Sequence, residues 1–125
     1  MAGSCSIQLN TVTMRNNNDT RITLDLTNRE ILPEDAVIYS MNMSKVNSSA
    51  VGSIILDNLT SGKTVALNMY SWDKLSIQSL NLQLRSRWRI EFGYSGNGSC
   101  SPKLQMNYVY PLKNVPSEDN IQISQ

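Results

Sequence analysis

Histidine is absent from this chain of 125 residues, which also contains only two cysteines. Without histidine the chain lacks the commonest general base, the usual partner of a nucleophilic serine or cysteine, and the favoured zinc ligand. Two cysteines alone cannot complete a four-ligand zinc site within one chain. A glycine-rich phosphate loop followed by a helix is missing as well. We therefore expect a protein that is not an enzyme and that holds no metal and no cofactor.

The chain also lacks a large net charge and long apolar runs. Eleven basic side chains nearly balance ten acidic ones, so the net charge is +1 and no overall field would attract nucleic acid. We expect no specific nucleic-acid partner. No apolar run approaches the roughly 20 residues that span a bilayer. The first ten residues, MAGSCSIQLN, lack the basic start and the apolar stretch of a signal peptide.

Alternation of apolar and polar residues is the dominant pattern that is present. Period-two runs begin at Ile22, Val37, Val65, Trp88 and Leu104, with connections rich in Asn, Ser and Gly. Short connections favour antiparallel pairing, because parallel strands need crossovers of about a dozen residues or more. The chain is therefore predicted to be all-β, folded as an antiparallel two-sheet β-sandwich or jelly roll of about eight short strands.

One domain is expected to account for residues 1–112. A chain of this length buries roughly two thirds of the surface that its unfolded form exposes, which is enough core to fold without covalent bridges. Pro111 ends the last predicted strand because proline cannot donate a hydrogen bond to a neighbouring strand. The remaining residues, 113–125, are mostly polar and are predicted to form a C-terminal tail.

The two cysteines lie in identical tetrapeptides, GSCS, around Cys5 and Cys100. Both stand at the edges of predicted strands and outside the apolar phase. A disulfide between them would close a loop of roughly 95 residues and stabilise the fold by about 4 to 5 kcal/mol. We expect this disulfide, and with it a secreted protein or one on the surface of a cell or virion. The missing signal peptide leaves a cytoplasmic location open.

A row of arginines is the first candidate for a binding site. In the stretch LRSRWRIEF, Arg85, Arg87 and Arg89 are two residues apart, so an extended strand presents their guanidinium groups on one face. Guanidinium groups suit carboxylate, phosphate or sulfate, which indicates an anionic ligand. The alternative is a solvated face on which the arginines pair with acids of neighbouring strands. Asp25 and Glu91 are the only acids predicted to lie in strands.

A second candidate lies in the stretch MYSWDKL, where the strand pattern fails. Tyr70 and Trp72 are followed there by Asp73. An exposed aromatic ring beside polar groups suits a sugar, because the ring stacks on its apolar face and the polar groups bind its hydroxyls. The same ring would also suit the interface of a bilayer. In a third interpretation Trp72 folds back and caps an open end of the sandwich.

Taken together, a rigid β scaffold, polar loops and missing catalytic groups favour a non-enzymatic recognition module of the lectin or adhesin type. Its partner would be a glycan or another cell-surface ligand, bound through Tyr70, Trp72 and Asp73 and through the arginine row. Two alternatives stay open. One is a structural subunit of a capsid, fimbria or fibre, which would form a homo-oligomer. The other is a lipid-binding or pore-forming β protein that contacts a membrane surface.

Overall fold

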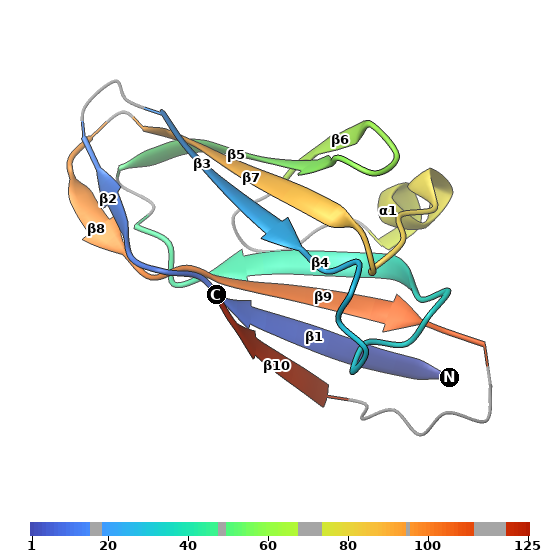
Figure 1. Cartoon of the computed structure of the whole chain (residues 1–125). Coiled ribbons are helices and arrows are strands. Elements are labelled where there is room, and N and C mark those ends of the chain that lie inside the picture. The colour runs from blue at the N-terminus through green and yellow to red at the C-terminus, as the bar shows by residue number, and fades with distance from the viewer. Residues whose placement is uncertain (16–18, 48–49, 68–73, 95, 112–119) are drawn as a thin grey trace.

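The computed structural model (Figure 1) describes residues 1–15, 19–47, 50–67, 74–94, 96–111 and 120–125. These residues form ten strands and one short helix, which confirms the predicted all-β class. In chain order the elements are β1 (Ala2–Gln8), β2 (Val12–Met14), β3 (Asp19–Asp25), β4 (Val37–Ser44), β5 (Val51–Asn58), β6 (Lys63–Ala66), α1 (Lys74–Leu80), β7 (Arg87–Tyr94), β8 (Gly98–Cys100), β9 (Lys103–Val109) and β10 (Asn120–Ser124).

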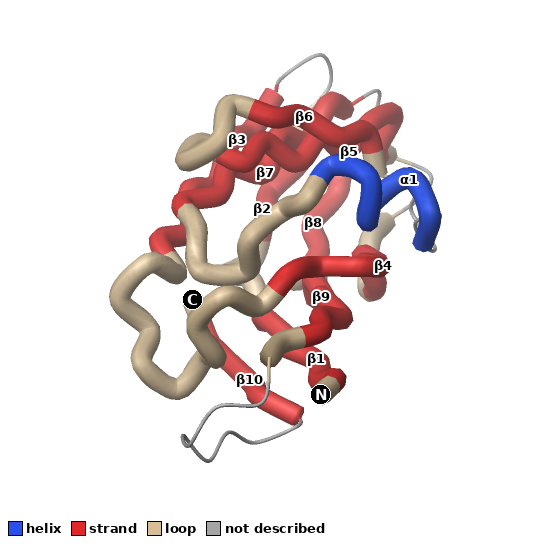
Figure 2. The backbone as a smooth tube through the Cα atoms, turned by 90° about the vertical axis from the view of Figure 1, so that its right-hand side faces the viewer, coloured by secondary structure: helices blue, strands red, loops and turns tan. Residues whose placement is uncertain are grey.

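Two four-stranded sheets make up most of the fold. We call the sheet with the order β10-β1-β9-β4 the β1 sheet, and the sheet with the order β3-β7-β5-β6 the β7 sheet. The two sheets form separate layers in a sandwich-like arrangement (Figure 2). A two-stranded ribbon of β2 and β8 lies at one end of both layers (Figure 1). Every pair of described strands is antiparallel except β1 with β10, which is parallel.

The core lies between the two sheets and is built by the predicted alternation. In β7 the side chains of Trp88, Ile90 and Phe92 are buried, and the residues between them point away from the core. The indole N–H of Trp88 donates a hydrogen bond to the Leu84 carbonyl at 3.1 Å, so this large buried ring leaves no polar group without a partner. In the described part of the chain, no helix has the length and apolar character needed to cross a membrane.

The predicted polar tail, residues 113–125, contains a strand. Residues Asn120–Ser124 form β10, which pairs with β1 in register and places Ile121 beside Cys5 and Ile123 beside Ile7. Ile121 and Ile123 are only 1% and 8% exposed. Two isoleucines two residues apart are a weak signal in a polar stretch. They form a strand because the free edge of β1 supplies hydrogen-bond partners and a place in the core.

The expected disulfide is not formed, because Cys5 and Cys100 are both free. Cys5 is fully buried in the inward phase of β1, opposite Met106. Cys100 pairs with Val12 in the separate β2–β8 ribbon, three residues before Lys103, which meets the far end of β1. Because strands rise about 3.3 Å per residue, this placement separates the Cα atoms of Cys5 and Cys100 by more than the roughly 7 Å that a disulfide allows. The prediction that both cysteines lie outside the apolar phase was wrong for Cys5.

Candidate binding faces

The outer face of the β7 sheet carries most of the charged side chains that strands position. β7 alternates between buried apolar residues and outward polar ones, and its neighbours β3 and β5 do the same in register. Among the side chains that the structure describes, we call the outward charged residues of these strands the charged face. They are Arg21, Asp25, Asp57, Arg87, Arg89 and Glu91.

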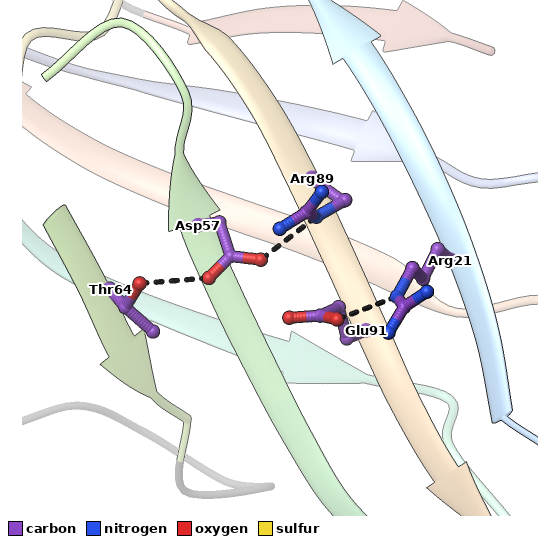
Figure 3. Close-up of polar contacts among 5 residues, drawn as sticks. All are labelled: Arg21, Asp57, Thr64, Arg89 and Glu91. Atoms are coloured by element: carbon purple, nitrogen blue, oxygen red, sulfur yellow. Dashed lines mark hydrogen bonds and ion pairs between the residues drawn. The ribbon is translucent and has the colours of Figure 1, made fainter. Parts of the chain in front are cut away.

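Two ion pairs order this face across the strands (Figure 3). The Nε atom of Arg89 lies 3.0 Å from Oδ2 of Asp57, directly opposite it in β5. The Nε atom of Arg21 lies 2.7 Å from Oε1 of Glu91, its partner across the other edge of β7. Three positive and three negative groups leave the charged face with no net charge. It therefore offers little attraction to an anionic ligand.

Asp57 is the most enclosed acid of the charged face. Burial alone would raise the pKa of its carboxyl group, but hydrogen bonds from Thr64 and Arg89 and the charge of Arg89 hold the pKa below its usual value. The hydroxyl of Thr64 in β6 donates to Oδ1 of Asp57 at 2.9 Å. Asp57 is therefore an ionised anchor that ties β5 to both of its neighbours.

The three predicted arginines do not form one row. β7 begins at Arg87, and Arg85 lies before it, where its guanidinium donates to the Thr27 carbonyl at 2.9 Å. Another nitrogen of Arg85 lies 3.5 Å from Glu34. The observed ion pairs correspond to the alternative interpretation, in which the arginines of a solvated face meet acids.

Arg87 faces another acid, Asp25, which lies opposite it in β3. Hydrogen bonds from the hydroxyl and backbone N–H of Thr27 hold the pKa of Asp25 below its usual value, and the charge of Arg87 adds to this effect. The second predicted cluster, Tyr70, Trp72 and Asp73, lies outside the described residues.

The outer face of the β1 sheet has a different chemistry. Three rows of outward side chains cross all four strands, and eleven of the twelve residues are Ser, Asn or Gln. We call these twelve residues the amide face. From β10 to β4, the rows are Asn120, Ser4, Asn107 and Ser40; then Gln122, Ser6, Gln105 and Asn42; then Ser124, Gln8, Lys103 and Ser44.

Hydrogen bonds within β9 and between neighbouring strands hold part of the amide face in place. The Gln105 amide donates to the Asn107 side-chain oxygen at 3.1 Å, and the Asn107 amide donates to the Ser40 hydroxyl at 2.9 Å. On the other side of β1, the Ser4 hydroxyl donates to the Asn120 oxygen at 2.9 Å. Each of these side chains is thereby oriented before any ligand arrives.

An apolar row continues the same face beyond the row that contains Ser4. It consists of Ala2, Val109 and Val37, which occupy register positions on β1, β9 and β4. Val109 is 43% exposed. The outer surface of the β1 sheet thus combines a small apolar strip with donors and acceptors that are uncharged except at Lys103.

Neither Asp57 nor the amide face could be recognised as a site from the sequence. Asp57 follows the apolar run Ile54–Leu56 and begins the stretch DNLTSGKT, which is typical of a turn, although Asp57 lies in phase with Ile55 on the outward side of β5. In the amide face, the local signal is the alternation of polar with buried residues within each strand, as with Gln105 and Asn107 in β9. No family model matches the chain, and comparison with curated proteins and with solved structures gives no match either.

Proposed function

We propose that the protein is a non-enzymatic recognition module that binds a neutral carbohydrate on the amide face. The observation that carries this proposal is the three rows in which eleven of twelve residues carry an uncharged hydroxyl or amide group, with the apolar row of Ala2, Val109 and Val37 beside them. A sugar presents hydroxyls that both donate and accept, together with apolar C–H patches. The two parts of this surface match those two parts of the ligand.

Side-chain amides suit hydroxyl ligands for a physical reason. Asn and Gln each offer a carbonyl acceptor and two N–H donors, and Ser both donates and accepts. Removing such neutral groups from water costs far less than removing charges. The hydrogen bonds that connect Gln105, Asn107 and Ser40 also fix their orientation, which lowers the entropy lost on binding.

Other classes of ligand fit this surface less well. The core of a protein interface is enriched in aromatic residues, Met and Arg and depleted in Ser, whereas the amide face contains none of the enriched types and several serines. A nucleic acid or an acidic polysaccharide would need positive charge, and Lys103 is the single charged residue among the twelve.

Affinity electrophoresis in native gels that contain neutral polysaccharides (a β-glucan, a xylan, a mannan and a galactan) tests the proposal. We expect at least one of them to retard the protein. The double substitution Gln105→Ala and Asn107→Ala should weaken that retardation at least tenfold, because it removes two central amides. The matched control is Thr23→Ala with Ser53→Ala, at outward positions of the β7 sheet. The proposal fails if no polysaccharide retards the protein or if both variants lose retardation equally.

The participation of Tyr70, Trp72 and Asp73 stays a sequence-based prediction. The substitution Trp72→Ala tests it separately in the same gels. If the ring stacks on the sugar, the polysaccharide that binds the wild type should no longer retard this variant. The reason is that the stacked aromatic ring contributes much of the contact area. Unchanged retardation would restrict the binding site to the amide face.

A further inference from the structure

The last strand of the chain is held by a single neighbour. β10 lies at the edge of the β1 sheet and, among the described strands, pairs with β1 alone. We propose that β10 is exchanged between two copies of this chain, so that the β1 of each copy pairs with the β10 of the other.

The site that receives β10 does not depend on β10 for its own support. β1 is paired with β9 along its whole length, from Ala2 opposite Val109 to Gln8 opposite Lys103. If β10 leaves, β1 therefore stays in the sheet and presents a free edge. Such an edge is a template for another strand, because its backbone N–H and C=O groups are unpaired.

The requirements of this site point to a second copy as the partner. An incoming strand has to fill the two core positions of Ile121 and Ile123. It also has to match polar contacts at both ends: Ser4 with the Asn120 side chain at 2.9 Å, and Gln8 and Asn10 with the backbone and side chain of Gln125 at 3.0 and 2.7 Å. The β10 of another copy meets all of these requirements without any change.

The length of the connection permits both pairings. Val109 and Asn120 lie on opposite sides of β1, beside Ala2 and Ser4. Two strand spacings across and two residues along put their Cα atoms about 12 Å apart. The eleven Cα–Cα steps between them can extend to about 36 Å or more. The chain is therefore long enough for β10 to pair with its own β1 and also to reach the β1 of an adjacent copy.

Exchange would change the amide face, since β10 contributes Asn120, Gln122 and Ser124 to it. In an exchanged pair each face would contain residues of both copies, and one particle would carry two faces. Two linked sites bind a repeating polymer more tightly than one, because the second contact becomes intramolecular. This consequence for avidity rests on the proposed function, whereas the exchange itself does not.

Disulfide trapping tests the exchange in the full-length chain. Ser6 and Gln122 are register partners on neighbouring strands, so cysteines at these positions meet the distance requirement of a disulfide. All variants carry Cys100→Ser, which removes the half-buried native thiol. One chain carries Ser6→Cys and the other Gln122→Cys. They are mixed at about 1 mM, near the effective concentration that a short tether provides, and then oxidised mildly.

We expect a covalent heterodimer whose bond maps to positions 6 and 122. The yield of this heterodimer should be more than ten times the yield from a control mixture. In the control, Ser53→Cys, on the β7 sheet, replaces Gln122→Cys. A single chain with both Ser6→Cys and Gln122→Cys, oxidised at micromolar concentration, should close an internal bond and so verify the register. The proposal is overturned if that chain closes its bond while the mixed chains stay monomeric or cross-link no more than the control. No glycan is present, so the result is independent of the proposed function.

Discussion

Arg89 and Asp57 face each other across β7 and β5, with 3.0 Å between Nε and Oδ2. The side chain of Asp57 is 9% exposed and that of Arg89 is 40% exposed, so the carboxylate depends on its partners more than the guanidinium does. Removing the guanidinium leaves an enclosed negative charge close to Glu91.

Arg89→Ala should therefore lower the free energy of unfolding by about 1–2 kcal/mol. Arg87→Ala, at an exposed position of the same strand, is the matched control and should change it by less than about 0.5 kcal/mol. Urea unfolding followed by tryptophan fluorescence measures both variants. Equal losses would show that the Asp57 pair adds nothing beyond the general packing of arginine stems.

The lowered pKa of Asp57 predicts a loss of stability in acid. A carboxyl group whose pKa is lower in the folded state than in the unfolded state contributes stability above the unfolded value of about 3.9, and this contribution disappears as the pH falls through the folded value. The urea midpoint should therefore fall steeply below about pH 4. In Asp57→Asn the urea midpoint should fall less steeply, because the variant lacks the carboxyl group whose protonation accompanies unfolding. If the profiles of the variant and the wild type run parallel from pH 2 to 6, Asp57 is not the linked group.

The strands that could be predicted from sequence are those whose own residues carry the alternation. β7 is clear because large apolar residues at every second position have charged residues between them. The end of β5 is not clear, since Asp57 and Asn58 resemble a turn. They stay in the strand because β6 and β7 supply pairing partners on both sides. Tertiary pairing, rather than local preference, decides such boundaries.

The amide face was out of reach of sequence analysis for a related reason. Its rows join residues as distant as Ser4 and Asn120, and they exist only once the order β10-β1-β9-β4 is known. No local sequence pattern indicates that β1 and β10 pair in parallel, because no turn connects the two strands directly. The disulfide prediction failed at the same step. The disulfide was expected because the first and last predicted strands would lie side by side. β1 and β9 do so, but they are antiparallel, so Cys5 lies opposite Met106 while Cys100 precedes the end of β9 that meets Gln8.

The two free cysteines should differ sharply in reactivity. Burial raises the pKa of the Cys5 thiol to about 11, so almost none of it is thiolate at neutral pH, while Cys100 is only half-buried. In the native protein, a thiol reagent such as a maleimide should label Cys100 at least tenfold faster than Cys5, as read by peptide mapping. In urea the two rates should converge. An intact mass two daltons below the reduced value, with both thiols blocked, would contradict the observed strand order.

Ile121 and Gln122 are neighbours in β10 with opposite environments, since Ile121 is 1% exposed and Gln122 points outward beside Ser6. A polar tail would treat substitutions at the two positions alike. In a paired strand, Ile121→Ala removes buried methyl groups and leaves a cavity beside Cys5, which should cost about 2 kcal/mol or more. Gln122→Ala should cost less than about 0.5 kcal/mol. Urea unfolding gives both values, and amide hydrogen exchange of residues 120–124 reports whether the loss is local. Equal and negligible effects at both positions would mean that β10 does not contribute to the folded core.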